Sequence, residues 1–278
     1  MILLKNKQYY YWNKKTVLPW VKFDKEMNNK FSYINKILLK NIKIKKDQSI
    51  LDIGCGSGFT SFHLSKIVGV NGAVKAVDIS RPLLNLFKKK YGNINNLSCV
   101  KKDLQKTNFK NNIFDHAISR FGLMFFEYPL QAFKHIYFSL KSSGSLTFVC
   151  WTNFRYNQFF SIPAYCVSKK INIDIPKISN KPGPFAFREK SYLKKLLRLS
   201  GFKKIIIKNI KTKLKINSVK SEVEIMMSLG IGAQMLRENN INENTFNVIR
   251  EDIRSQLKKV IKVQNYYKAN IFLVTAIK

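Results

Sequence analysis

Leu51-Asp52-Ile53-Gly54-Cys55-Gly56-Ser57-Gly58 is the stretch of the sequence that decides the fold. It follows an apolar, strand-like run and places an acidic residue and three alternating glycines where a strand would turn into a helix. Glycine adopts positive φ without a steric penalty and lets a ligand approach the backbone closely. The first N–H groups of the following helix have no intrahelical partner and point toward whatever occupies the turn. The stretch therefore predicts a strand–turn–helix unit suited to a nucleoside cofactor.

The spacing of these residues differs from two other nucleotide-binding motifs. In the dinucleotide fingerprint G-x-G-x-x-G the last two glycines are separated by two residues, whereas here the last gap is one residue and Asp52 precedes the glycines. The sequence also lacks a G-x-x-x-x-G-K-[ST] phosphate loop. Neither a dinucleotide site nor a phosphate loop is therefore expected.

Strand-like and helical patterns alternate along the rest of the chain. Runs that fit strands cover residues 73–79, 97–100, 114–119, 146–151, 203–207 and 271–276. Helical patterns cover residues 60–68, 130–140 and 192–199, and a further helix is expected to begin after Ser80 as its N-cap. Such alternation indicates parallel βαβ units and hence an α/β fold.

Three acidic residues, Asp52, Asp78 and Asp103, fall at the carboxyl ends of expected strands. Ligands of open parallel sheets bind at those ends. Asp78 also lies about 20 residues after the glycines, where a doubly wound fold places the acid that binds a ribose. The three side chains are therefore expected to share one ligand site.

The pattern D-x-G-x-G-x-G resembles the first motif of class I S-adenosylmethionine-dependent methyltransferases. From about Tyr11 onward, the chain resembles their type 11, ubiquinone/menaquinone-biosynthesis-like group. Residues 119–126 followed by Pro129, and residues 148–151, look like a bacterial branch of that group. The resemblance implies a Rossmann-like, doubly wound, mostly parallel sheet with an antiparallel last strand and helical cap elements. It also implies S-adenosyl-L-methionine as cofactor.

The resemblance further implies the cofactor-binding residues, which are Asp52, Gly54, Cys55, Gly56, Gly58, Asp78, Ile79, Asp103, Leu104 and Ser119. The glycine backbone would pass under the methionine moiety, and Asp52 would bind its ammonium group directly or through water. Asp78 would take the ribose hydroxyls, while Asp103 would accept a hydrogen bond from the adenine amine. The alternatives, that Asp78 only caps a helix and that Asp103 is a solvated loop acid, stay open.

No residue of the sequence stands out as a general base, so the catalytic residues remain unknown. Methyl transfer from a sulfonium mainly requires alignment of the reacting atoms, and a base is needed only where the acceptor must lose a proton. His63, His116 and His135 are interpreted as structural, because none sits at a strand end. The four cysteines lack metal-ligand spacing, so no metal site is expected.

The chain divides into an N-terminal helical lid segment, residues 1–46, and a methyltransferase domain, residues 47–278, with cap insertions at about 153–188 and 211–268. Tyr11, Trp12 and Trp20 are the lid candidates, with aromatic packing on the sheet edge as the alternative. Aromatic residues of the first insertion would suit a small, apolar or aromatic acceptor, although core packing explains them nearly as well.

The formal net charge is +34, from 50 basic residues that include 42 lysines and 8 arginines. Such a charge suggests nucleic acid or an anionic surface as a partner. Its spread along the chain, with abundant asparagine and isoleucine, favours genome bias. Methylation of RNA or protein therefore remains an alternative to a small-molecule acceptor, as does a non-catalytic protein that binds S-adenosylmethionine.

The sequence contains no apolar run long enough to span a membrane. Its first residues lack the apolar run and cleavage site of a signal peptide. A cytoplasmic location is therefore expected, and the four unpaired-looking cysteines agree with a reducing compartment. The sequence does not indicate the oligomeric state.

Overall fold

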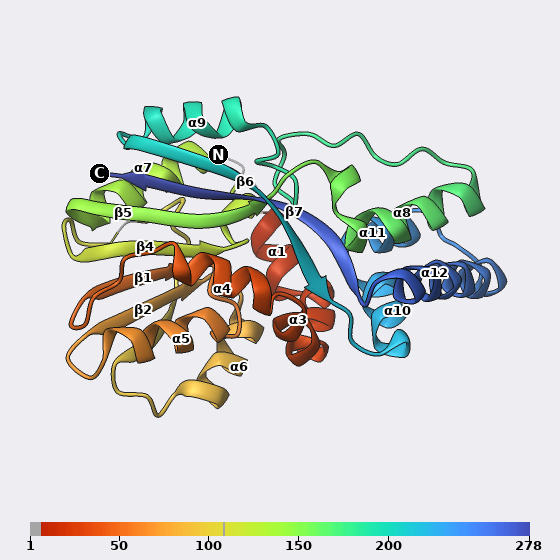
Figure 1. Ribbon diagram of the computed structural model, residues 1–278, viewed down its shortest axis with the longest axis horizontal. Coiled ribbons are helices and arrows are strands. Elements are labelled where there is room, and N and C mark those ends of the chain that lie inside the picture. Colours follow the sequence, from red (N-terminus) through yellow and green to blue (C-terminus); the bar gives the residue numbers. More distant parts are fainter. Residues whose placement is uncertain (1–6, 108) are drawn as a thin grey trace, which may run out of the picture.

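A seven-stranded sheet forms the centre of the computed structural model, which describes residues 7–107 and 109–278 (Figure 1). Residues 1–6, which entered the expectation about a signal peptide, lie outside the described residues. The strands are β1 (Ser49–Ile53), β2 (Ala73–Asp78), β3 (Leu97–Lys101), β4 (Phe114–Arg120), β5 (Leu140–Trp151), β6 (Lys203–Lys215) and β7 (Tyr266–Ile277). Their order across the sheet is β3-β2-β1-β4-β5-β7-β6.

The direction of the strands confirms the expected fold class. β1 pairs in parallel with β2 and β4, and β3 and β5 extend this parallel core. The last strand of the chain, β7, runs antiparallel to both β5 and β6. The carboxyl ends of β1, β2 and β4 therefore meet at one edge of the sheet, which faces the helices on the right of Figure 1.

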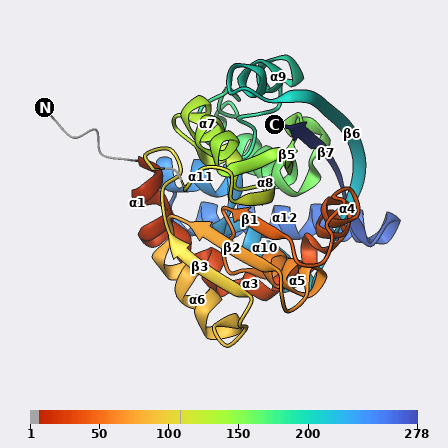
Figure 2. The same ribbon diagram turned by 90° about the vertical axis from the view of Figure 1, so that its left-hand side faces the viewer.

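Helices cover both faces of the sheet, as the end-on view in Figure 2 shows. α4 (Ser32–Lys40) and α5 (Phe59–Val68) lie on one face, and α7 (Pro129–Ser139) and α9 (Lys190–Leu199) pack against the other. α6 (Arg81–Tyr91) packs on β2 and β3, and the Ser80 hydroxyl caps it by accepting the N–H of Leu83. In α9 the apolar spacing i, i+3, i+4 buries three leucines, at about 1.5–3 kcal/mol for each fully buried side chain.

Three strands are longer than expected. β5 begins at Leu140 and contains an irregularity at residues 141–144, where the partner shifts from Phe114 to His116. β6 continues to Lys215 and β7 begins at Tyr266. In β6, exposed lysines alternate with buried Ile207 and Leu214, as suits an edge strand that must not pair with another sheet. The local sequence alone therefore predicts too short a strand here.

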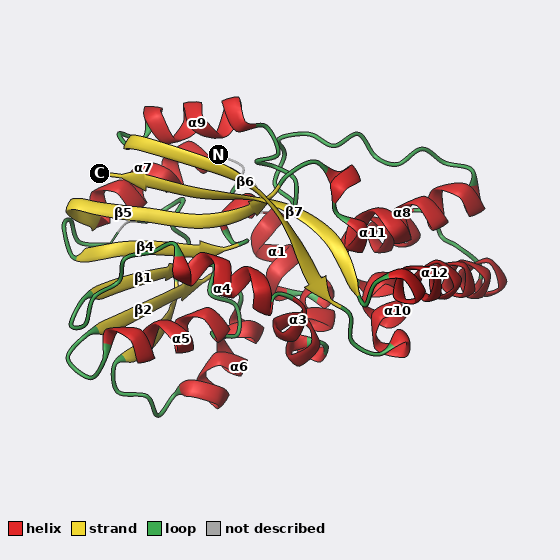
Figure 3. Cartoon of the chain, in the orientation of Figure 1, coloured by secondary structure: helices red, strands yellow, loops and turns green. Residues whose placement is uncertain are grey.

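Two groups of helices lie beyond the carboxyl ends of the parallel strands (Figure 3). The N-terminal group comprises α1 (Lys7–Asn13), α2 (Leu18–Lys22) and α3 (Asp24–Lys30). The cap group comprises α8 (Gln158–Ile171), α10 (Val219–Ser228), α11 (Gly230–Glu238) and α12 (Glu243–Val263). Short 3-10 turns cover Lys15–Val17, Leu123–Phe125 and Phe154–Tyr156. One apolar core continues from the sheet into both groups, so they pack as parts of one body.

Among the helices of residues 7–107 and 109–278, none combines the length and the hydropathy that a bilayer-crossing helix requires.

Candidate active site

A cavity of about 550 Å³ lies at the carboxyl ends of β1, β2 and β4. Its floor is the turn after β1, and its walls come from the N-terminal helices on one side and from α8 and α11 on the other. The lining includes seven of the ten predicted cofactor residues, which are Asp52, Gly54, Cys55, Gly56, Asp78, Ile79 and Leu104. The tertiary structure thus brings most of the predicted set to one space.

The glycine turn is folded tightly against its neighbours. Gly54, Gly56 and Gly58 have φ values of 64°, 55° and 87°, in the region that favours glycine. The N–H groups of Gly54 and Cys55 both donate to the Val77 carbonyl, at 2.8 and 3.1 Å. A Cβ on Gly54 would lie 2.7 Å from the Gly122 Cα, so the turn touches the backbone after β4 directly. Only Gly56 has open space above it, with Leu83 Cδ1 at 4.0 Å as the nearest atom.

Asp78 joins the turn to the start of α6. Its Oδ2 accepts the N–H of Gly56 at 2.8 Å, and its Oδ1 accepts the N–H of Ser80 at 2.8 Å. Burial raises the pKa of the Asp78 carboxyl, and these hydrogen bonds oppose the rise. The carboxylate therefore organises the loop while it lines the cavity. The N-cap of α6 is Ser80, and binding of the ribose by Asp78 stays a prediction.

Asp52 and Arg120 form the charged end of the cavity. Asp52 is 1% exposed, accepts a hydrogen bond from the Ser61 hydroxyl at 2.5 Å, and has a pKa that burial raises to about 7. Arg120 ends β4, and its Nη2 donates to Asn28 Oδ1 of α3 at 2.7 Å. Sequence reasoning missed both Arg120 and Asn28 as site residues. The signal for Arg120 was its position directly after the predicted strand at residues 114–119.

Three predicted cofactor residues do not line the cavity. Gly58 is covered by the Phe87 ring, which would lie 2.3 Å from an added Cβ. The Ser119 hydroxyl donates to the Ile53 carbonyl at 2.7 Å and accepts the N–H of Gly122 at 3.2 Å. Asp103 accepts hydrogen bonds from the backbone N–H and the amide of Gln105, at 3.0 and 3.1 Å. These three residues contact other protein groups next to the cavity, and direct contact with a cofactor remains a prediction for them.

The lid candidates Tyr11, Trp12 and Trp20 all line the cavity. Trp12 makes an edge contact with Phe125 at 5.0 Å between ring centroids, across the cavity from the N-terminal helices to the segment after β4. Asn13 ties α1 to the end of β2, because its Nδ2 donates to the Ile79 carbonyl at 3.0 Å. The aromatic residues thus line the cavity near the end of β2, and their role as a lid stays a prediction.

Part of the cavity wall is aromatic. The rings of Phe121 and Trp151 stack at 4.2 Å with an interplanar angle of 10°. Phe31 lies 5.3 Å from Phe121, and Phe160 of α8 lies 5.3 Å from Trp151. All four residues line the cavity, so the glycine turn and this aromatic chamber share one space.

None of the three histidines lines the cavity. His63 contacts the Phe59 carbonyl, His116 the Ser145 hydroxyl and His135 the Leu104 carbonyl, each through Nδ1 at 2.7–2.8 Å. The part of the chain that the structure describes also contains no group of three or more His, Cys, Asp or Glu residues placed to hold a metal ion. Cys55 lines the cavity as a buried thiol whose pKa burial raises.

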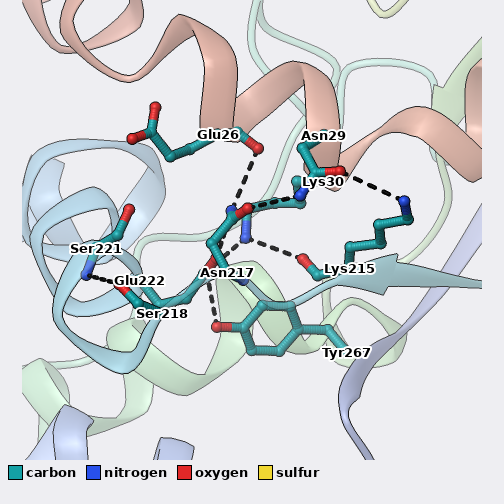
Figure 4. Close-up of polar contacts among 9 residues, drawn as sticks. All are labelled: Glu26, Asn29, Lys30, Lys215, Asn217, Ser218, Ser221, Glu222 and Tyr267. Atoms are coloured by element: carbon teal, nitrogen blue, oxygen red, sulfur yellow. Dashed lines mark hydrogen bonds and ion pairs between the residues drawn. The ribbon is translucent and has the colours of Figure 1, made fainter.

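A buried ionic cluster joins α3 to the cap group (Figure 4). Lys30 of α3 pairs with Glu222 of α10, and both side chains are completely buried. The Tyr267 hydroxyl donates to Glu222 Oε2 at 2.9 Å, and the backbone N–H and side-chain amide of Asn217 donate to Oε1 at 2.9 Å. The Lys30 Nζ also lies 4.9 Å from the ring of Phe159, a cavity residue. The cluster therefore couples α3 to the cap.

The residues present fit S-adenosylmethionine on three observations. The space above Gly56 lets a ligand approach the backbone, Asp78 is a hydrogen-bond acceptor at the end of β2, and Arg120 Nη1 is buried with no protein partner. The carboxylate of Asp78, the open backbone at Gly56 and the guanidinium of Arg120 thus lie along one edge of the sheet, at the ends of β2, β1 and β4.

Comparisons with known proteins agree with this geometry. Residues 51–148 match the family model of a methyltransferase domain. The chain is 28% identical over 184 residues to a demethylmenaquinone methyltransferase of Staphylococcus haemolyticus, covering 63% of this chain and 76% of that relative. It is 30% identical over 159 residues to the ubiquinone/menaquinone biosynthesis C-methyltransferase UbiE of Wigglesworthia glossinidia brevipalpis, covering 53% of this chain and 64% of that relative. Its fold resembles a phosphoethanolamine N-methyltransferase of Haemonchus contortus, with a TM-score of 0.61 and 16% identity over 100% of this chain and 61% of that one.

The sheet order, the glycine turn with its strand-end acids and the matched domain define a class I S-adenosylmethionine-dependent methyltransferase. Within this class, the chain is similar to the ubiquinone/menaquinone-biosynthesis-like group, as its two curated relatives show.

Proposed function

We propose that the protein transfers the methyl group of S-adenosylmethionine to a small, apolar or aromatic organic acceptor held in the aromatic chamber. One observation carries this proposal: the glycine turn and the chamber formed by Phe31, Phe121, Trp151 and Phe160 line the same cavity. Donor and acceptor would therefore meet without leaving the protein. The names of the two curated relatives, both methyltransferases of quinone biosynthesis, support an aromatic ring as the acceptor.

The roles of the site residues follow from their positions. Asp78 would accept hydrogen bonds from the ribose hydroxyls, Ile79 would pack on the adenine, and Asp52 would bind the ammonium group. The sulfonium of the bound cofactor makes its methyl carbon electrophilic. The protein would then mainly align the acceptor with that carbon, and such positioning can lower a barrier by about 7–11 kcal/mol. The aromatic rings over the cavity would exclude water.

A cytoplasmic location and a small-molecule partner are part of the proposal. The four cysteines are free, which agrees with a reducing compartment. The lysines are spread over the chain rather than gathered in the cavity. Among the described residues that line the cavity, one is a lysine, Lys102. A cavity of about 550 Å³ lined by aromatic rings suits a small acceptor better than RNA or a protein chain.

Labelled methyl transfer tests the proposed function. The purified protein, incubated with methyl-labelled S-adenosylmethionine and a cell lysate, is expected to label the fraction that extracts into organic solvent. Asp78→Asn should abolish this labelling and weaken binding of S-adenosylhomocysteine about 10- to 100-fold, because the amide leaves one buried N–H of the loop unpaired. Asp174→Asn, at an exposed position outside the cavity, is the matched control.

Two results would contradict the proposal. Label that appears only in the RNA or protein fraction would exclude a small acceptor. Calorimetry that detects no binding of S-adenosylhomocysteine to the wild-type protein would exclude the donor site itself.

Donor affinity is expected to increase with pH between 6 and 8. The pKa of Asp52 is raised to about 7, so its carboxylate loses charge as the pH falls below that value. Only the ionised carboxylate attracts an ammonium group, so affinity for S-adenosylhomocysteine should fall by up to about tenfold per pH unit below 7. Calorimetry at several pH values measures this slope. Asp52→Asn should bind more weakly with a flatter profile, and an unchanged slope in that variant would exclude Asp52 as the titrating group.

A further inference from the structure

The guanidinium of Arg120 is incompletely paired inside the protein. It lines the cavity at the end of β4, and Nη2 donates to Asn28 Oδ1 at 2.7 Å, while Nη1 is buried without a hydrogen-bond partner. The rings of Phe59 and Phe31 lie 5.3 and 5.9 Å from its Cζ. A buried cation is costly unless charge and hydrogen bonds compensate it, and Asn28 with two aromatic rings supplies only part of that compensation.

The two nearest carboxylates are engaged with other groups. Asp52 accepts the Ser61 hydroxyl, and Asp24 pairs with Lys90 and accepts the Asn28 amide at 3.1 Å. Neither forms an ion pair with Arg120 within 4.0 Å, as judged over the described part of the chain. The charges of Asp52 and Asp24 oppose the fall in the Arg120 pKa that burial causes, but Nη1 still lacks a hydrogen-bond acceptor, which an anion bound in the cavity would supply.

The sheet order indicates which anion this is. β1 lies between β2 and β4, so Asp78 at the end of β2 and Arg120 at the end of β4 flank the glycine turn on opposite sides. A donor whose ribose lies at Asp78 and whose chain crosses the turn would bring its amino-acid end to Arg120 and Asp52. That end carries one carboxylate and one ammonium group, which match the two opposite charges there.

We propose that Arg120, held in place by Asn28, binds the carboxylate of the donor's methionine moiety. This assignment rests on the proposed function and names the contact that fixes the amino-acid end of the donor. Guanidinium and carboxylate match in geometry as well as in charge, because the planar fork donates two parallel N–H bonds. Asn28 acts as a positioning residue, because its carbonyl restrains one arm of the guanidinium.

A comparison of two ligands tests the carboxylate contact. S-adenosylhomocysteine and its decarboxylated analogue, S-adenosyl-3-thiopropylamine, differ only in the carboxylate. Calorimetry should show that the wild-type protein binds the first about 10- to 100-fold more tightly than the second. Arg120→Gln should lose that difference, so that S-adenosylhomocysteine and the analogue bind with similar affinity. Arg120→Lys should retain part of the difference, since it keeps the charge without the fork.

Two further variants make the test specific. Asn28→Ala leaves the guanidinium in place and should lower the preference for the carboxylate-bearing ligand by a smaller factor. Arg198→Gln removes an exposed arginine of α9 and should bind both ligands as the wild type does. A preference for S-adenosylhomocysteine over the analogue that Arg120→Gln keeps at the wild-type size would overturn the carboxylate contact alone. Failure of the wild type to bind S-adenosylhomocysteine would overturn the proposed function together with this contact.

Discussion

Replacing Glu222 with leucine is expected to lower the free energy of unfolding by about 3–5 kcal/mol. The substitution leaves Lys30 as an uncompensated charge at a site with no solvent exposure, and it removes the acceptor for Tyr267 and Asn217. Urea unfolding followed by circular dichroism measures the change. Lys30→Met should have a similar effect, because it leaves the Glu222 carboxylate buried without its cationic partner.

The pH dependence of Glu222→Leu identifies the cause. Burial already lowers the pKa of Lys30 from 10.5, and Glu222 opposes that shift. Without Glu222 the pKa of Lys30 in the folded protein falls further below its unfolded value. At neutral pH, folding must then either remove the proton from Lys30 or bury its charge, and both cost free energy. The stability deficit should therefore shrink as the pH rises toward 10.5.

Two controls separate the buried pair from general effects of the substitution. The double variant Lys30→Met/Glu222→Leu removes both charges and should recover much of the lost stability, because an apolar replacement of a buried pair is often tolerated. Glu251→Leu removes one partner of an exposed pair with Arg254 and should change stability by less than about 0.5 kcal/mol. A single variant as stable as the wild type would show that the cluster contributes little.

Gly54→Ala is expected to abolish measurable donor binding and to destabilise the protein by about 2–5 kcal/mol, from crowding and backbone strain together. The added Cβ would lie 2.7 Å from the Gly122 Cα, and the residue has a φ of 64°. Because the contact is backbone against backbone, the strain can be relieved only by separating the turn from the end of β4. That movement would displace the floor of the cavity.

Two matched glycine variants separate crowding from strain. Gly122→Ala keeps an ordinary helical φ of −76° but places a Cβ 2.7 Å from the Ile53 carbonyl, so it tests crowding. Gly56→Ala has a φ of 55° with no atom closer than 4.0 Å, so its effect on stability tests backbone strain of about 1–2 kcal/mol. Thermal unfolding and calorimetry with S-adenosylhomocysteine measure both. If Gly54→Ala is no worse than Gly56→Ala, the close approach to Gly122 is not required.

Local rules were sufficient for the parallel core of the sheet and for the turn after β1. The alternation of strands and helices, the glycines and the Ser80 cap act over a few residues, so their consequences can be inferred without knowing what packs around them. The position of Asp78 at the end of a predicted strand was likewise enough to predict that it lines the cavity. β6 was underestimated because its exposed lysines mask the strand pattern, and its pairing with β7 depends on a partner far along the chain.

The sequence by itself determined the class of fold, the glycine turn and the acid at the end of β2. Only the tertiary structure decided which distant residues complete the site. Asn28 meets Arg120 across 92 residues of sequence, and Lys30 meets Glu222 across 192. Such pairs leave no periodic pattern, because each partner alone is an ordinary polar residue on a helix or strand. They become specific only when packing removes both from water, where an unpaired charge is costly.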